Sequence, residues 1–154
     1  MRPLASRTRR GLFALGLLLA VVATHAATTG SGKAATESRE ASGFAAISLR
    51  GGIDLVVRQG AREGVQVTAD DNLLSLLQTV VEGSGEQRTL VIQWPRGETI
   101  RTRARTVVTV DVVRLTALAS SGSGDIAVEA LKTPPMTLSI SGSSKDAGPT
   151  GSSI

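Results

Sequence analysis

The segment LTALASSGSGDIAV, residues 115–128, decides the fold expected of this chain. Part of it returns 20 residues later in LSISGSSK, residues 138–145, so that Leu118 aligns with Leu138 and the tripeptide Ser-Gly-Ser recurs. A fixed period near 20 residues is typical of solenoid coils, which turn at small residues and bury their apolar faces by stacking. The repeat therefore predicts stacked β coils, although a stable solenoid normally needs three or more of them.

Short runs of alternating apolar and polar residues surround this segment from Phe44 onward. A period of two residues is typical of half-buried strands, and turn signals rich in glycine and proline separate the runs. At least seven strands are therefore expected, in an all-β domain. The alternating apolar residues are Ile53, Leu55, Val57, Val65, Val67, Ala69, Leu90, Ile92, Trp94, Val108, Val110, Val112, Ile126, Val128, Met136, Leu138 and Ile140.

Residues 70–83 break this pattern and predict a short helical insert. Asp70 or Asp71 is expected to cap one or two helical turns, because aspartate is favoured at helix N-caps. The β-branched residues that follow return the chain to an extended conformation. The apolar residues of the expected turns are Leu73, Leu74 and Leu77.

Residues 1–26 have the three parts of an export signal: basic residues, an apolar run and a cleavage site with small residues. The apolar run, Gly11–Ala23, has thirteen residues, whereas a helix that spans a bilayer needs about 20. We expect cleavage near Ala26, no stable membrane span afterwards, and a location in the periplasm or at the cell surface. An uncleaved anchor is the alternative, and the Arg9-Arg10 pair leaves the secretory and twin-arginine routes both open.

The charge of the chain depends on that signal. The formal net charge is +4, but four arginines lie in the first ten residues and no acidic residue precedes Glu37. The mature chain is therefore expected to be neutral, which removes the main electrostatic support for a nucleic-acid partner. Its aromatic residues are Phe44 and Trp94 alone, too few for a base-stacking surface. We expect no nucleic-acid partner.

Missing residue types exclude several chemistries. The chain has no cysteine and no tyrosine, and its one histidine, His25, lies in the predicted signal. Without imidazole or thiolate, neither a Ser-His or Cys-His nucleophile nor a zinc site can be assembled. We therefore expect no catalytic residues, no cofactor and no metal. The alternative is a carbohydrate-active enzyme that uses paired carboxylates. The candidates for such a pair are Asp54, Glu63, Asp70, Asp71, Glu82, Glu98, Asp111 and Asp125.

The motif Gly122, Ser123, Gly124, Asp125 resembles the glycine-aspartate repeats of calcium-binding solenoids. Those repeats place one residue between the last glycine and the aspartate, whereas Gly124 and Asp125 are adjacent. We interpret the motif as a turn in which the glycines adopt left-handed conformations and Asp125 hydrogen-bonds nearby amides.

Arg101, Arg103 and Arg105 form the densest basic cluster outside the signal. They alternate with Thr102 and Ala104, which predicts that all three project from one face of an extended segment. Such a patch suits an acidic polysaccharide, a lipid phosphate or a nucleic acid. The alternative is a solvated strand face whose charges discourage strand addition, and the neutral mature chain favours it.

Four segments, taken in order, resemble the auto-transporter adhesin head GIN domain family. They are FAAISLRGGIDLVVRQG, VQVTADDNLLSLLQTVVEG, TLVIQW and LTALASSGSGDIAV, and the resemblance covers residues 44–143. The order of the segments and the motif SGSGDI, residues 121–126, are its most specific features. The resemblance implies an exported bacterial envelope domain, built as a right-handed parallel β-helix or a related β-solenoid. It implies adhesion to an envelope or extracellular surface component, and it supplies no catalytic residues.

The flanks of this region differ from it in composition. Residues 27–43 are small and polar and predict a flexible linker. The second copy of the repeat has Ser144 and Lys145 where the family pattern implies glycine and aspartate, and residues 144–154 show no strand period. We expect a disordered tail after an incomplete, truncated or frame-shifted domain. Its exposed solenoid edge would favour self-association.

Overall fold

The computed structural model describes residues 26–129, 131–132 and 137–141. The expected export signal, apart from Ala26, the expected tail at 144–154, and Met136 lie outside the described residues. The prediction of an all-β domain is confirmed, since the described elements are twelve strands and one 3-10 helix. They are β1 (Thr28–Thr29), β2 (Ala34–Arg39), β3 (Ala46–Arg50), β4 (Asp54–Gln59), β5 (Gly64–Asp70), β6 (Gln78–Glu82), η1 (Gly85–Gln87), β7 (Thr89–Gln93), β8 (Ile100–Arg101), β9 (Val107–Val112), β10 (Ala117–Ser121), β11 (Ile126–Val128) and β12 (Thr137–Ser141).

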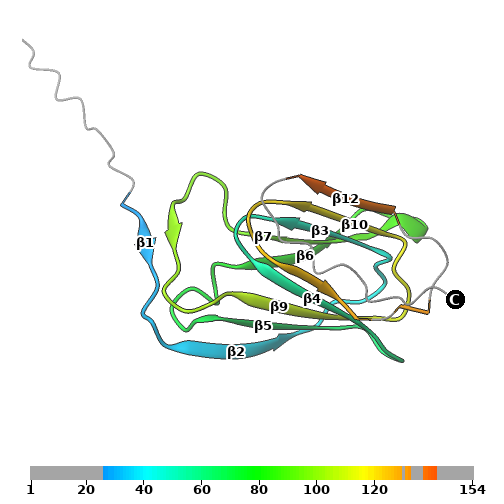
Figure 1. Cartoon of the computed structure of the whole chain (residues 1–154), viewed down its shortest axis with the longest axis horizontal. Coiled ribbons are helices and arrows are strands. Elements are labelled where there is room, and N and C mark those ends of the chain that lie inside the picture. Colours follow the sequence, from blue (N-terminus) through cyan, green and yellow to red (C-terminus); the bar gives the residue numbers. More distant parts are fainter. Residues whose placement is uncertain (1–25, 130, 133–136, 142–154) are drawn as a thin grey trace, which may run out of the picture.

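Ten of these strands form two five-stranded sheets that lie face to face (Figure 1). The β3 sheet has the order β12-β10-β3-β7-β6, and the β4 sheet has the order β11-β4-β9-β5-β2. Each is parallel at one end and antiparallel at the other: β6 runs antiparallel to β7, and β5 runs antiparallel to both β9 and β2. β1 and β8 form a separate parallel pair.

These mixed sheets correct the expectation of a uniformly parallel β-helix. β6 and β7 are joined through a short connection, Gly83–Arg88, and a connection of that length can join only antiparallel neighbours. The order of the strands in space also differs from their order in the chain, because β3 lies between β7 and β10. The described fold is therefore two open, mixed sheets.

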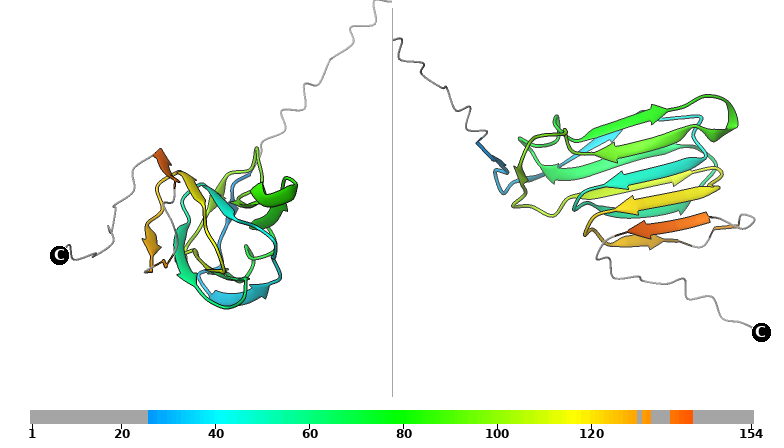
Figure 2. Two further views of the ribbon diagram at one scale, coloured as in Figure 1. Left: turned by 90° about the vertical axis from the view of Figure 1, so that its right-hand side faces the viewer. Right: turned by 90° about the horizontal axis from the view of Figure 1, so that it is seen from above.

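The 20-residue repeat is the register of one parallel strand pair. β10 pairs with β12 so that Leu118 lies beside Leu138 and Ser121 beside Ser141, as the sequence alignment predicts. Three strands of the β3 sheet are each followed in the chain by a strand of the β4 sheet. β3 leads to β4, β7 leads through β8 to β9, and β10 leads to β11 (Figure 2).

The core lies between the two sheets and consists of the inward side chains of the alternating runs. Its largest fully buried side chains are Ile47, Leu49, Ile53, Leu55, Leu73, Leu77, Leu90, Ile92, Leu115, Leu118, Val57 and Val67. Full burial of each such side chain stabilises the fold by about 1.5 to 3 kcal/mol. Four of the predicted core residues differ: Trp94, Val128 and Ile140 are only partly buried, and Leu138 is 52% exposed.

The expectation of a flexible linker at 27–43 is wrong for residues 34–39, which form β2. β2 pairs with β5 along all six of its residues, Ala34–Arg39. It lacks an apolar period because it is an edge strand in which only Ala35 and Arg39 are even half-buried. Backbone hydrogen bonds thus hold β2 in the sheet, and a search for apolar alternation cannot detect a strand of this kind.

The expected helical insert is a pair of hydrogen-bonded turns. The backbone N–H groups of Leu74 and Leu77 donate to the carbonyl oxygens of Asp70 and Leu73, both at 3.2 Å, but no continuous helix forms. The guanidinium of Arg39 in β2 donates to the carbonyl oxygens of Leu74 and Leu77, which fastens the turns to the β4 sheet.

Candidate functional site

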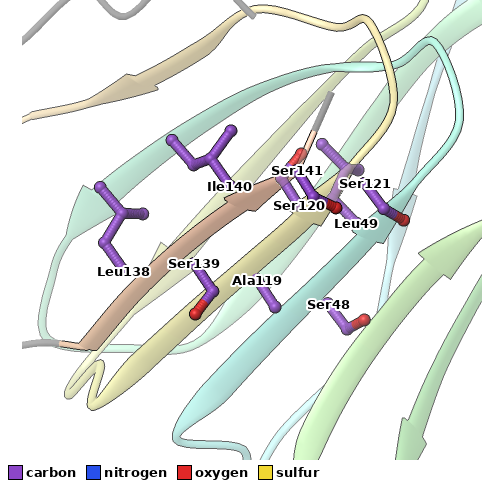
Figure 3. Close-up of a pocket in the computed structure, with 9 residues that line it drawn as sticks. All are labelled: Ser48, Leu49, Ala119, Ser120, Ser121, Leu138, Ser139, Ile140 and Ser141. Carbon is purple, nitrogen blue, oxygen red and sulfur yellow. The ribbon is translucent and has the colours of Figure 1, made fainter. Parts of the chain in front are cut away.

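The outer face of the β3 sheet carries a row of small side chains across three parallel strands. Ser48 of β3, Ala119 of β10 and Ser139 of β12 are in register, so these residues lie side by side. Because side chains alternate along a strand, they point away from the core. Figure 3 shows this row, with Leu138 and Ile140 projecting from the opposite side of β12.

This row belongs to the lining of a surface pocket of about 430 Å³. Its lining comes from three adjacent strands and consists of Ser48, Leu49, Ala119, Ser120, Ser121, Leu138, Ser139, Ile140 and Ser141. Every polar side chain among these is a serine hydroxyl, which both donates and accepts hydrogen bonds. The pocket can therefore hold a polar ligand by hydrogen bonds, and its lining contains no charged group.

A second polar row borders the pocket on the same face. Gln93 and Arg50 lie in register with Ser121 and Ser141 across β7, β3, β10 and β12. The Arg50 Nη1 donates to Gln93 Oε1 at 3.4 Å, and Gln93 Nε2 donates to Gln78 Oε1 at 3.2 Å. This row offers amide, guanidinium and hydroxyl groups along the end of the pocket, and none of them is a general base at neutral pH.

The predicted turn motif lies between β10 and β11, where it packs against the turn between β3 and β4. Gly122 has a φ of +151°, which glycine favours, and a Cβ built on it would overlap the backbone of Gly51. Gly124 has no positive φ, yet a Cβ on it would overlap the carbonyl of Ile53. Glycine is thus needed at position 124 for close approach of two backbones, a reason that the sequence interpretation missed.

Asp125 of the same motif belongs to a chain of polar contacts. Its backbone N–H donates to Asp54 Oδ1 at 2.9 Å, and its carboxylate lies 3.3 Å from Nη2 of Arg105. Arg105 also binds Asp54 through Nε. The hydrogen bond and charge of Asp54, together with the charge of Asp125, raise the pKa of Arg105 against a smaller opposing effect of desolvation. These contacts join three neighbouring strands of the β4 sheet at one end.

The three arginines of the expected anion patch do not share one strand. Arg101 ends β8, and residues 102–106 that follow are irregular. Arg103 donates its backbone N–H to Asp70 Oδ2 at 3.0 Å, and Arg105 is held by two carboxylates. All three side chains are exposed, but the extended segment that would align them on one face is absent from this part of the described chain.

Asp70, at the end of β5, is a buried carboxylate that joins three segments. It is 0% exposed and accepts hydrogen bonds from the backbone N–H groups of Gly32 at 2.6 Å and Ala104 at 3.1 Å, besides that of Arg103. Burial alone would raise the pKa of Asp70, but these backbone donors outweigh it and lower the pKa. Gly30 leaves room for the carboxylate, since a Cβ there would overlap it.

Four of the eight carboxylates proposed for carbohydrate chemistry make structural contacts: Asp54, Asp70, Asp111 and Asp125. Asp54 and Asp125 are paired with Arg105, and Asp111 is paired with Arg58 at 3.0 Å. The acid of a glycosidase pair needs a raised pKa, whereas that of Asp70 is lowered. Within residues 26–129, 131–132 and 137–141, no group of three or more His, Cys, Asp or Glu could hold a metal ion. The described part also contains no helix long and apolar enough to cross a membrane.

The row on the β3 sheet was not singled out from the sequence, although a signal for it exists. Residues 46–57 and 117–128 are in register at an offset of 71, which aligns Gly51 with Gly122 and Asp54 with Asp125. That alignment would have placed Ser48 beside Ala119, and the 20-residue repeat adds Ser139.

Together these features define an all-β domain of two facing mixed sheets, with small and hydroxylated residues on one outer face. The chain belongs to the family described as "Putative auto-transporter adhesin, head GIN domain", whose model matches residues 43–146. β1 and β2 precede the matched region. No curated protein matches the chain.

Solved structures share the fold. A putative adhesin from Bacteroides fragilis NCTC 9343 is 21% identical with a TM-score of 0.66, over 75% of this chain and 53% of its own. A putative adhesin from Parabacteroides distasonis ATCC 8503 is 22% identical with a TM-score of 0.61, over 77% and 58%. A putative lipid binding protein from the same strain is 25% identical with a TM-score of 0.58, over 67% and 44%. The match thus spans about half the length of these proteins.

Proposed function

We propose that this chain is an exported, non-catalytic adhesin-like domain that binds a polysaccharide on the outer face of the β3 sheet. The observation that carries the proposal is the pocket of about 430 Å³ over the row Ser48, Ala119 and Ser139. Membership of the head GIN domain family supports the adhesive role. The predicted export signal at residues 1–26 supports a location in the periplasm or at the cell surface.

The chemistry of the face favours a hydroxyl-bearing polymer. Serine hydroxyls and glutamine amides both donate and accept, which suits sugar hydroxyls better than a ligand of fixed charge. No aromatic ring contributes to the pocket lining, so each contact contributes little. Useful binding then depends on many contacts repeated along a polymer and between many copies on a surface, as in multivalent adhesion.

We further propose that the strand pairs β3–β4, β7–β9 and β10–β11 are three coils of an irregular solenoid. Their mutual register supports this view, because equivalent residues of adjacent coils lie side by side in both sheets. The antiparallel strands β2, β5 and β6 then cover one end of the stack. In this arrangement the outer face of the β3 sheet is the flat side of the stack, on which a polymer can lie across successive coils.

The test compares two exposed alanines on opposite outer faces. Ala119→Tyr fills the pocket, whereas the control Ala127→Tyr adds the same side chain to β11 of the β4 sheet. Both variants and the unchanged chain are applied to a printed array of neutral and acidic bacterial and host polysaccharides. We expect retention on at least one polysaccharide, reduced at least tenfold by Ala119→Tyr and unchanged by Ala127→Tyr. Equal retention of all three proteins would contradict the proposal.

Two further measurements distinguish polysaccharide binding from lipid binding and from enzymatic activity. Phospholipid spots are included because one solved neighbour is described as a putative lipid binding protein. Retention on lipid alone would contradict a polysaccharide ligand. Reducing ends or unsaturated products released from the retained polysaccharide, and abolished in an Asp54→Asn, Asp125→Asn variant, would establish the carboxylate enzyme instead. N-terminal sequencing of the chain recovered from cells checks for cleavage after Ala26.

A further inference from the structure

β12 is an edge strand whose inward side chains are only partly covered. Leu138 lies beside the buried Leu118 and faces the same side of the sheet, yet it is 52% exposed, and Ile140 is half-buried. The facing β4 sheet ends at β11, at the same end of the molecule as β12 (Figure 2), and these two side chains remain accessible to solvent beside it. An apolar stripe therefore opens at this end of the molecule.

Of the other three edges of the five-stranded sheets, two carry charged residues within the strand, and the third has them directly beside it. β6 contains Glu82, β2 contains Glu37 and Arg39, and β11 lies between Asp125 and Glu129. Charges on an edge strand discourage the addition of another strand. β12 has the sequence Thr-Leu-Ser-Ile-Ser and carries no charge. Among the edge strands of the two five-stranded sheets, β12 is thus the one with no charged residue in the strand or directly next to it in the sequence.

The hydrogen bonds of β12 show which of its backbone groups remain available. The N–H of Thr137 donates to the carbonyl oxygen of Thr116 at 3.0 Å, and the carbonyl oxygen of Ser141 accepts from Gly122 at 3.2 Å. In a parallel pair, alternate residues bond to the same neighbouring strand. Thr137, Ser139 and Ser141 therefore face β10 with their backbone groups. The N–H and C=O groups of Leu138 and Ile140 point to the open edge.

We propose that two copies of this chain associate by antiparallel pairing of their β12 strands, about a two-fold axis that passes beside Ser139. In this register Leu138 of one copy lies opposite Ile140 of the other, and each such pair exchanges two hydrogen bonds through the open backbone groups. Ser139 lies opposite its own equivalent in a pair without hydrogen bonds. The two β3 sheets become one continuous sheet of ten strands. This inference does not rest on the proposed polysaccharide ligand.

A second copy fits this edge because the pattern of β12 reads the same in both directions. Polar and apolar residues alternate symmetrically about Ser139, so a two-fold axis places leucine against isoleucine and hydroxyl against hydroxyl. Opposed apolar pairs of this kind stabilise antiparallel strands. A two-fold interface also requires one surface to complement itself, and the strand meets that condition.

The first experiment uses the absence of cysteine from the chain. Ser139→Cys places the only thiols of two copies opposite each other, in a pair without hydrogen bonds, where the Cβ atoms come within about 4.5 to 5.5 Å. The control Ser121→Cys carries an exposed thiol on the same face of β10, an internal strand. Under mild oxidation of the full chain we expect a disulfide-linked dimer from Ser139→Cys and at least tenfold less from Ser121→Cys. Equal cross-linking, or none, overturns the proposal.

The second experiment measures association without a cross-link. Sedimentation of the full chain over a range of concentrations is compared with Leu138→Lys and with the control Val80→Lys, at a residue of β6 that is 50% exposed. We expect Leu138→Lys to raise the dimer dissociation constant at least tenfold and Val80→Lys to change it less than twofold. A mixture of Leu138→Lys with Ile140→Glu should restore dimers, because lysine and glutamate then face each other.

Several outcomes of these two experiments would contradict the proposed pairing of β12 strands. A chain that stays monomeric at every concentration, or equal effects of Leu138→Lys and Val80→Lys, would show that β12 is not the interface. A mixture that does not restore dimers would refute the antiparallel register. Binding of a different strand at this edge would leave the sedimentation of the purified chain independent of its concentration, and would likewise overturn the pairing of two copies.

Discussion

Replacement of Gly124 by alanine tests the close packing between the turn after β10 and the turn after β3. A Cβ at this position would overlap the carbonyl group of Ile53 and lie 2.8 Å from its backbone nitrogen. The obstacle is backbone, so no side-chain rotation can relieve it. β11 would have to move away from β4 by a large fraction of a van der Waals radius.

The cost follows from the contacts that this movement breaks. The N–H of Leu55 donates to the carbonyl oxygen of Asp125 at 2.8 Å, and the N–H of Glu129 donates to that of Val57 at 2.9 Å. Two weakened hydrogen bonds cost about 1 kcal/mol each, and overpacking adds about 1 to 3 kcal/mol. We therefore expect a loss of about 3 to 5 kcal/mol in the free energy of unfolding, which lowers the Tm of a domain of this size by roughly 10 to 20 °C.

The control is Gly64→Ala in β5. Neither glycine has a positive φ, so the backbone conformation itself does not require glycine at either position. A Cβ on Gly64 would meet its nearest atom, Asp111 Oδ2, at 3.9 Å, an ordinary contact. We expect no loss, or a gain of about 0.5 kcal/mol. Thermal and urea unfolding can be followed by fluorescence of Trp94, the only tryptophan. A loss below 1 kcal/mol for Gly124→Ala, or equal effects of the two variants, would refute the packing argument.

Three further predictions concern stability. The lowered pKa of Asp70 means that its carboxylate stabilises the fold above the ordinary carboxyl pKa of about 3.9, and that this contribution is lost as the pH falls through the folded-state pKa. Asp70→Asn should therefore lower the Tm at pH 7 more than at pH 2, and equal losses at both would contradict the role of the charge. Arg39→Gln should cost about 1 to 3 kcal/mol in urea unfolding, because the carbonyl oxygens of Leu74 and Leu77 lose a charged donor; an unchanged urea midpoint would show that this contact contributes nothing. Leu55→Ala should cost about 2 to 5 kcal/mol by cavity formation, and calorimetry would exclude a closely packed core at this point if the loss were below 1 kcal/mol.

The inward residues of the fold could be predicted from the sequence because burial imposes a period of two. The apolar residues at every second position of two runs are all buried: Leu55 and Val57 in β4, and Val108 and Val110 in β9. The register of β10 and β12 was equally accessible, because parallel strands in register repeat their sequence at a fixed offset. Both inferences rest on constraints that act locally along the chain.

Other parts of the structure depend on contacts that leave little trace in the sequence. β2 is held by backbone hydrogen bonds at an edge, where almost any polar residue is tolerated, so 34–39 reads as a linker. The candidate binding face consists of Ser48, Ala119 and Ser139, small residues that are common in turns, and only the register makes them one surface. The roles of Arg105 and Asp54 as partners depend likewise on the stacking of strands distant in the chain.

The position of β3 between β7 and β10 has a consequence for the time at which the domain can fold. Ala46 pairs with Thr89, 43 residues later, and with Ala117, 71 residues later. The central strand of this sheet is therefore made long before either of its neighbours. Strands so distant in the chain pair slowly. The chain must lose the conformational entropy of a long loop before the contacts between the strands can form. A nascent chain of this order therefore cannot complete the β3 sheet until β7 and β10 have both been synthesised.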